Sequence, residues 1–422
     1  MRYVLVICHL LAALAISASA QEPLSPAVLC PPVPRAAAPD SLPRPLPPLV
    51  PTPDTVRGLY VSRWAAIGVR MNELLAAAER TEINTLVIDV KDDRGLVLYR
   101  SGVPLARAIG ADTNRPMKHE RLRAVLDTMR AHGLYPIARI VVIKDPLLAD
   151  ARPAWAIRSR RDSARAWHDR QGRPWLDPHQ DGPWRYAADL ACEAVALGFS
   201  EVQFDYVRFP DDVRLQHDAA FPLAHGRSRA EVIRDQLALT HDRLRPLGVP
   251  ITADVFGLTT TDTSDMGIGQ QWEMLLPTVD VILPMMYPSH YYAGMYGLAN
   301  PNAHPSRTIH HGLEDALRRS AGVAHAARIR PWYQDFTLGA PRYGPAQVRA
   351  QIDAGYALGV RSWLLWNSRS AYSYAALRPK AAPVTPAAAP AAPPPSPNGR
   401  SAPPPRSPSR TPHGTHRGGP AR

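Results

Sequence analysis

Two strand-like runs of the sequence carry a carboxylate near their ends. The run EVQFDYV (201–207) contains Asp205, and the run ITADVFG (251–257) contains Asp254. Paired carboxyl groups perform glycoside hydrolysis: one donates a proton, and the other is a nucleophile or a base for water. Neighbouring strands lie ~4.8 Å apart. That spacing is compatible with both retaining and inverting geometries, so it leaves the stereochemistry open.

Side chains alternate between the two faces of a strand, which assigns a direction to each carboxylate. Gln203 and Asp205 share one face, while Phe204 is expected to face a helix layer, so Asp205 should point inward. Asp254 shares its face with Phe256. Candidate substrate-binding residues at or near the strand ends are Asp89, Lys91, Arg139, Gln203, Arg208, Tyr287, His290, Trp332, Gln334, Asp335, Trp366 and Asn367.

Each candidate also has a structural interpretation. Asp89 and Lys91 could form an ion pair, and Arg139 could be the buried counter-charge of a carboxylate. Asp254 could have a capping or salt-bridge role, and Trp366 could be a residue of the packed core. Asp211 and Asp212, which follow Pro210, are typical of solvated loop charges. Aromatic rings beside carboxylates favour a sugar ligand, because sugars have apolar C–H faces and many hydroxyls.

Other chemistries lack the required residues. The histidines are scattered, and none forms two His plus a carboxylate at one strand end, so we predict no metal and no cofactor. No serine lies in a nucleophile elbow, and no cysteine suits thiol catalysis. Cys30 and Cys192 remain once a signal peptide carrying Cys8 is removed; their separation leaves their pairing open.

The body of the chain alternates between strand and helix patterns. Strand-like runs occur at 58–64, 83–91, 135–143, 201–207, 251–257, 279–287, 328–336 and 361–367. Helical patterns follow most of them, as at 71–81, 120–133, 184–198, 229–248 and 344–359. Eight such units predict an α/β fold, a (β/α)₈ TIM barrel, whose sites lie at the C-terminal strand ends. An open doubly wound sheet is the alternative, but the first βα turn lacks a Gly-rich phosphate loop.

The two ends of the chain differ from its body. Residues 1–20 show one Arg, an apolar run and a small-residue cleavage pattern, which predict a signal peptide cut near Ala20 and a periplasmic or extracellular protein. An uncleaved membrane anchor is the alternative. Residues 21–56 contain 12 prolines, and residues 379–422 contain 14. Such segments bury too little apolar surface to fold, so we predict disordered Pro-rich flanks around a barrel domain at 57–378.

The positive charge is concentrated in the tail. The net charge is +12, and residues 379–422 supply +6 of it, with six Lys or Arg and no Asp or Glu. The body is therefore only mildly basic, which argues against a nucleic-acid partner. The tail could contact anionic envelope polymers; a solvated tail is the alternative.

Seven motifs together resemble a known family. In order, they are VIDVKDDRG, YPIARIVVIKDPLLA, EVQFDYVRFP, TADVFG, ILPMMYPSHYYAG, RPWYQDF and LLWNSRSAY. They resemble a glycosyl-hydrolase domain family of bacterial envelope proteins, long catalogued as a domain of unknown function, from about Arg57 to Tyr374. The resemblance implies a TIM barrel and a polysaccharide substrate. It implies site roles for Asp205 and Asp254, with Asp335 as a third carboxylate.

Three functions fit the sequence. The first is an exported glycoside hydrolase that cleaves a bacterial polysaccharide with Asp205 as nucleophile or base and Asp254 as acid. The second is a non-catalytic carbohydrate-binding barrel. The third is an envelope adhesion protein whose basic tail is the working part. The sugar, its linkage and the oligomeric state are not specified by these patterns.

Overall fold

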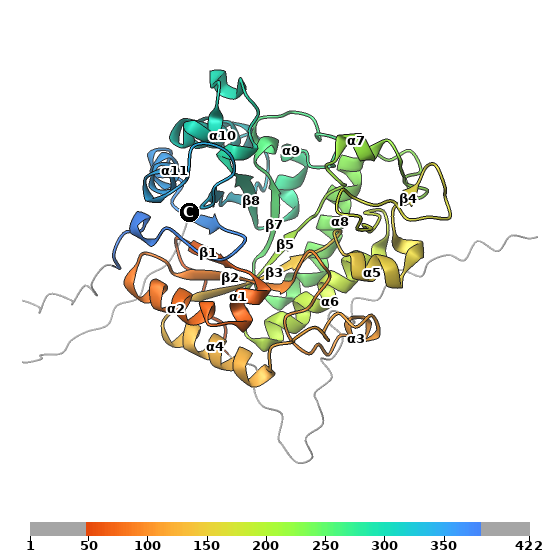
Figure 1. Cartoon of the computed structure of the whole chain (residues 1–422), viewed down its shortest axis with the longest axis horizontal. Coiled ribbons are helices and arrows are strands. Elements are labelled where there is room, and N and C mark those ends of the chain that lie inside the picture. Colours follow the sequence, from red (N-terminus) through yellow and green to blue (C-terminus); the bar gives the residue numbers. More distant parts are fainter. Residues whose placement is uncertain (1–47, 381–422) are drawn as a thin grey trace, which may run out of the picture. The chain divides into compact units, whose positions relative to one another are not determined.

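The computed structural model describes residues 48–380, which form a barrel of parallel strands (Figure 1). Neighbours around the barrel run β10-β11-β1-β2-β3-β5-β7-β8, and β10 also pairs with β8, which closes the ring. The strands are β1 (Arg57–Val61), β2 (Thr85–Lys91), β3 (Tyr135–Val141), β5 (Glu201–Asp205), β7 (Ile251–Phe256), β8 (Val281–Met286), β10 (Trp332–Gln334) and β11 (Trp363–Trp366). The predicted (β/α)₈ barrel is confirmed, and the alternative of an open sheet is wrong.

The seventh strand of the barrel is interrupted. The predicted run 328–336 splits into β9 (Arg328–Ile329) and β10, with Arg330 and Pro331 between them. Proline has no N–H to donate to a neighbouring strand, which explains the break. At the break, Arg330 pairs with Glu201 at 2.6 Å (Nη1 to Oε1), and both side chains are buried.

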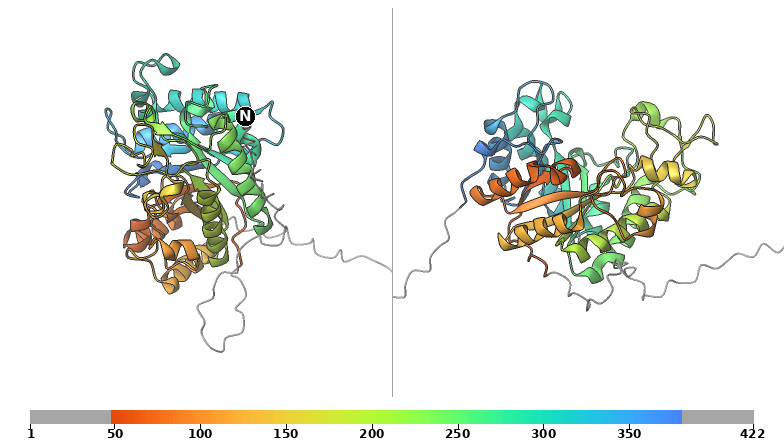
Figure 2. Two further views of the ribbon diagram at one scale, coloured as in Figure 1. Left: turned by 90° about the vertical axis from the view of Figure 1, so that its right-hand side faces the viewer. Right: turned by 60° about the horizontal axis from the view of Figure 1, so that its bottom comes forward.

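Helices surround the strands on the outside (Figure 2). They are α1 (Arg63–Ile67), α2 (Arg70–Arg80), α3 (Pro104–Ala108), α4 (His119–Ala131), α5 (Pro146–Ala151), α6 (Asp181–Leu197), α7 (Val213–Gln216), α8 (Arg229–Leu244), α9 (Trp272–Leu275), α10 (Pro305–Ser320) and α11 (Pro345–Ala357). Ser228 and Glu231 form a capping box that starts α8. Gly198, with φ 115°, ends α6 as predicted. Between β11 and Lys380, the last residue that the structure describes, there is only a 3₁₀ turn, η8 (Tyr374–Ala376).

The apolar core has two parts, as the alternation of side chains requires. The larger part lies between strands and helices and contains Leu59, Ile88 and Phe204. The smaller part fills the barrel and contains Tyr60 and Trp332. Phe204 therefore faces the helices, which sends its neighbour Asp205 into the barrel as predicted.

Residues 48–56, predicted as the end of the linker, pack against the N-terminal end of the barrel. The N–H of Val50 donates to Ser200 Oγ at 2.9 Å, and the N–H of Val56 donates to Ser362 Oγ at 3.0 Å. Both valines are buried and belong to the inner core. The predicted signal peptide (1–20), the rest of the linker (21–47) and the tail from 381 lie outside the described residues.

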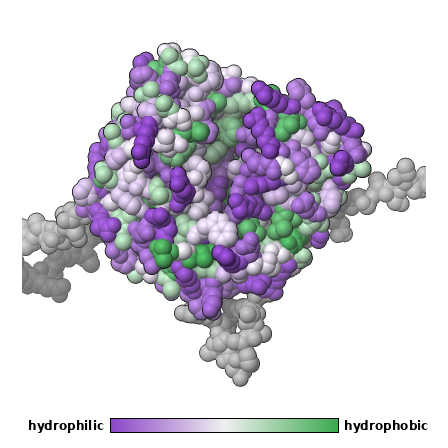
Figure 3. All heavy atoms as spheres, in the orientation of Figure 1, coloured by the Kyte–Doolittle hydropathy of each residue, from purple (hydrophilic) through white to green (hydrophobic). Residues whose placement is uncertain are grey.

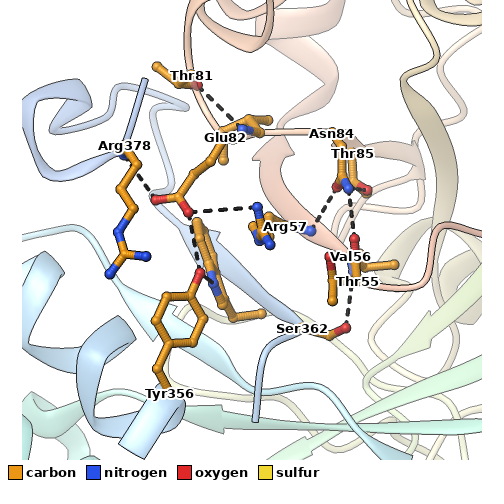
Figure 4. Close-up of polar contacts among 12 residues, drawn as sticks. Thr55, Val56, Arg57, Thr81, Glu82, Asn84, Thr85, Tyr356, Ser362 and Arg378 are labelled. Carbon is orange, nitrogen blue, oxygen red and sulfur yellow. Dashed lines mark hydrogen bonds and ion pairs between the residues drawn. The ribbon is translucent and has the colours of Figure 1, made fainter. Parts of the chain in front are cut away.

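A polar cluster around Glu82 joins distant parts of the chain at the same end (Figure 4). The Glu82 carboxylate accepts from the backbone N–H of Arg378 at 2.9 Å and from the Tyr356 hydroxyl at 3.3 Å. Asn84 Oδ1 accepts from the Arg57 N–H at 2.8 Å. These contacts stabilise the end of the barrel at which the strands begin. They do not involve the C-terminal ends of the strands.

Cys192, buried on α6, is disulfide-bonded. Within residues 48–380, we find no helix whose length and apolar character would let it span a bilayer.

Candidate active site

A cavity of about 320 Å³ opens at the C-terminal ends of the strands. Its volume is within the range of small-molecule sites. Eight predicted residues line it: Arg139, Asp205, Arg208, Asp254, Tyr287, His290, Trp332 and Trp366. The closed barrel brings these side chains together from β3, β5, β7, β8, β10, β11 and the loops that follow them.

Arg139, on β3, is the electrostatic centre of the site. Its Nη1 donates to Asp89 Oδ1, its Nη2 donates to Asp205 Oδ2, and its Nε lies 3.6 Å from Asp254 Oδ2. All four side chains are almost fully buried. Buried charges are stable only when they are paired. Arg139 is therefore the common cationic partner of three carboxyl groups, as well as part of the cavity wall.

Asp205 is the last residue of β5. Its Oδ1 accepts from the backbone N–H of Tyr206 at 2.5 Å, and its Oδ2 accepts from Arg139. Tyr206 has φ 53°, a left-handed conformation that is uncommon for a bulky residue and often marks functional sites. The turn at Tyr206 directs the chain outward from the barrel immediately after the carboxylate, so Asp205 lies at the mouth.

Asp254 is more completely buried than Asp205. Its Oδ1 accepts from Trp332 Nε1 at 2.7 Å and from Gln203 Nε2 at 2.8 Å. Burial, and then the negative charge of Asp205, raise the pKa of Asp254 well above its usual range, although Arg139 opposes them. A carboxyl group with a raised pKa keeps its proton at neutral pH and can act as a general acid.

Asp89 adds a second titratable group to this network. Burial raises the pKa of Asp89 to about 6, against the opposing effects of Arg139 and of the Tyr60 hydroxyl, which donates to Oδ2 at 2.5 Å. The folded protein therefore binds a proton that the unfolded chain has lost between about pH 4 and pH 6. Stability from this group is present below pH 4 and is lost as pH rises through this window.

The Asp89→Asn variant tests that assignment. We expect the contribution of Asp89 to make the free energy of unfolding of the wild type fall between pH 4 and pH 6, by up to ~1.4 kcal/mol for each pH unit. The variant has no carboxyl group at position 89, so its free energy of unfolding should fall less over the same pH range. Urea unfolding at pH 4, 5 and 6 measures both slopes. Equal slopes in the two proteins would contradict the raised pKa of Asp89.

Aromatic rings form the other wall of the cavity. Trp366 lies between Tyr60 and Tyr287, with ring centroids 6.0 and 5.6 Å away and interplanar angles of 31° and 30°. Phe336 meets Trp366 edge-on at 5.2 Å. Trp366 is partly exposed and lines the cavity. Its indole can pack against the apolar face of a sugar ring while the carboxylates meet the hydroxyls.

Comparison with known proteins identifies the family of the chain. The model of the family described as "Putative glycosyl hydrolase domain" matches residues 58–372. The chain belongs to this family. The description of the family supports glycoside hydrolase function in general. No curated protein matches the chain.

Three solved structures illustrate the relationships of this glycosyl hydrolase domain. A hypothetical protein from Ruminiclostridium thermocellum ATCC 27405 is 36% identical over 47% of this chain and 97% of its own, with TM-score 0.42. The PgaB (BpsB) glycoside hydrolase domain from Bordetella bronchiseptica is 12% identical, over 75% of this chain and 95% of its own, with TM-score 0.53. Alpha-L-fucosidase isoenzyme 2 from Paenibacillus thiaminolyticus is 13% identical, over 76% of this chain and 48% of its own, with TM-score 0.50. The last two show a shared fold.

Several predicted site residues of the domain lie outside the cavity wall. Gln203 is buried beneath the cavity and holds Asp254. A register shift between Asp89 and Lys91 turns Lys91 out of the barrel, where it pairs with Asp145 at 2.7 Å. Asp89 and Lys91 therefore do not share a face, and they have different partners.

The predicted residues at the ends of β10 and β11 hold loops in place. Gln334 Oε1 accepts from the N–H of Ser289 at 3.1 Å. The two Asp335 oxygens accept from the N–H and the hydroxyl of Ser373, each at 2.8 Å. Asn367 Nδ2 donates to the Asp335 carbonyl at 2.5 Å. These groups support the rim of the site instead of lining its cavity.

Sequence reasoning missed part of the cavity wall. The additional lining residues are Tyr206, Asp211, Phe256, Gly257, Leu258, Met285 and Tyr291. Phe256 could have been found, because alternation places it on the same face as Asp254. Asp211, predicted as a solvated loop charge, lines the cavity with its side chain about half exposed. Its position depends on the loop after β5, for which the sequence gives no periodic signal.

Proposed function

We propose that the protein is an exported glycoside hydrolase that cleaves a bacterial polysaccharide with Asp254 as proton donor and Asp205 as nucleophile or base. One observation carries the proposal. A carboxyl group with a raised pKa and a carboxylate beside the same guanidinium line one cavity, together with aromatic rings. Two carboxyl groups in unequal environments are the arrangement that glycoside hydrolysis uses.

The two carboxyl groups have different roles in the proposed reaction. Asp254 gives its proton to the glycosidic oxygen as the C–O bond breaks, so the leaving sugar departs as an alcohol. Asp205 either attacks the anomeric carbon, with water later replacing it, or takes a proton from the water that attacks. In both cases one water is consumed per bond broken. The rings of Trp366 and Tyr287 hold the sugar, and Arg139 keeps Asp205 in position.

The export part of the proposal rests on the predicted signal peptide at residues 1–20. A signal peptide would deliver the enzyme to the compartment where extracellular polysaccharides are found. Detection of the mature protein, starting at Gln21, in the periplasmic or secreted fraction would support it. A full-length chain in the cytoplasmic fraction would contradict it.

Product formation tests the proposed activity. The purified protein is incubated with a panel of bacterial extracellular and capsular polysaccharides, and the products are separated by size. We expect at least one polymer to be shortened to oligosaccharides with new reducing ends. Binding to a polymer without any shortening would instead favour the non-catalytic carbohydrate-binding barrel.

A further inference from the structure

Arg208 has hydrogen-bonding capacity that the protein does not use. The residue is 5% exposed and lines the cavity. Its Nη1 donates to the Phe209 carbonyl at 3.3 Å, a long contact, and its Nε has no hydrogen-bond partner among the described residues. A buried polar group without partners is costly to a folded protein. A guanidinium maintained in this state at a cavity wall suggests that a ligand completes its hydrogen bonds.

Three aromatic rings fix the orientation of this guanidinium. Its central carbon lies 4.6 Å from the ring centroids of both Tyr206 and Phe256, and 5.3 Å from that of Trp175. Rings that stack on a guanidinium hold its plane and leave its edge for in-plane hydrogen bonds. That edge matches the geometry of a carboxylate or another planar or tetrahedral oxyanion.

Asp211 neutralises Arg208 only in part. Its Oδ1 lies 3.3 Å from Arg208 Nη1, and its side chain is 47% exposed. Because the Asp211 carboxylate is about half exposed, water screens its attraction to Arg208 and weakens the ion pair. A ligand anion can therefore compete with Asp211, while Asp211 reduces the affinity for that anion.

A basic lobe extends from the same wall. Residues 152–173, after β3, contain seven arginines and two aspartates. Their short strand β4 (Arg158–Ser159) pairs with β6 (Ala219–Ala220), which follows β5. Exposed arginines of the lobe are Arg152, Arg160, Arg161, Arg165 and Arg170. Figure 1 places β4 and α7 together on the right, and that side of the face in Figure 3 is mainly hydrophilic.

We infer that the polysaccharide carries anionic groups and that Arg208 binds one of them beside the reacting bond. The basic lobe then attracts further anions of the same polymer. The inference rests on the proposed function and narrows its substrate class to acidic polysaccharides. The shared chemistry is an oxyanion substituent, either the carboxylate of a uronic acid or a sulfate ester.

Binding, measured without turnover, tests the inference separately from catalysis. The ligands are uronic acid oligosaccharides, their methyl esters (which are neutral), sulfated neutral oligosaccharides and glucosamine oligomers. Affinities are measured by calorimetry on the wild type and on Asp205→Asn. We expect an acid or sulfated ligand to bind roughly 10-fold to 100-fold more tightly than its neutral counterpart, the range of a charged hydrogen bond. Preference for sulfate over carboxylate would assign the oxyanion as sulfate.

Matched variants assign the effect to Arg208. Arg208→Gln should abolish the difference between acid and ester, and Arg208→Lys should retain only part of it, because an ammonium lacks the planar fork. Asp211→Asn should tighten binding of the acid and leave the ester unchanged. Arg361→Gln is the control: it removes the same charge from an exposed site at the opposite end of the barrel. The inference would be overturned if no anionic ligand, whether acid or sulfated, bound more tightly than its neutral counterpart, or if the protein preferred glucosamine oligomers.

Discussion

Replacing Asp254 with asparagine is expected to lower kcat/KM on the polysaccharide by roughly 10²–10⁴-fold, the contribution of a positioned general acid. The amide has the same shape and can still accept from Trp332 and Gln203, but it has no acidic proton. The pH dependence should also change. Activity of the wild type should fall as pH rises through the raised pKa of Asp254, because the acid must be protonated, and this alkaline limb should disappear in the variant.

The matched control for this prediction is Asp335→Asn. Asp335 is also a buried carboxylate at a strand end, but Ser373 occupies both of its oxygens and it does not line the cavity. We expect kcat/KM of the folded control to stay close to the wild-type value, with its alkaline limb intact. An Asp254→Asn enzyme that keeps the alkaline limb would show that another group donates the proton.

Replacing Arg139 with glutamine is expected to destabilise the protein by about 3–5 kcal/mol, the cost of leaving buried charges without a partner. Three carboxyl groups lose their common cationic partner. Arg139 now lowers the pKa of Asp89 and of Asp254, so its removal should raise both pKa values further. A group whose pKa is raised by folding stabilises the protein less as pH rises. The destabilisation caused by Arg139→Gln should therefore be larger at pH 7 than at pH 5.

Urea unfolding of the variant and the wild type at both pH values measures this effect. Arg318→Gln is the control, since Arg318 also pairs with an aspartate, Asp315 at 2.6 Å, but on an exposed helix surface. Its expected cost is below about 1 kcal/mol. An Arg139→Gln protein as stable as this control would mean that the three carboxylates do not depend on Arg139.

The barrel could be predicted because its signals are local and repeated. Alternation in EVQFDYV places Phe204 against the helices and Asp205 inside, and the structure has both. Gly198 ends α6 where a left-handed residue is needed. The C-terminal ends of all the parallel strands lie at one end of a barrel, so the sequence also predicts that Asp205 and Asp254 lie at the same end.

The remaining part of the site depends on a register shift, a turn and a loop, none of which produces a periodic pattern in the sequence. The register shift after Asp89 turns Lys91 away from the barrel interior to a buried position beside Asp145, and alternation cannot reveal one inserted residue in a strand. The turn at Tyr206 with positive φ, and the loop that brings Asp211 back to Arg208, are set by tertiary contacts. Arg139 could be identified as a counter-charge, but its three partners come from separate strands and appear only when the ring closes.

The most direct test of the account is the rate at which wild type and Asp205→Asn release reducing ends from a polysaccharide that the wild type cleaves. The two proteins are compared at equal concentrations of folded enzyme, established by urea unfolding and circular dichroism. If Asp205 is the nucleophile or base, the variant should lose at least roughly 10²-fold in rate. Equal rates for the two proteins would contradict the assignment of this barrel's chemistry to Asp205.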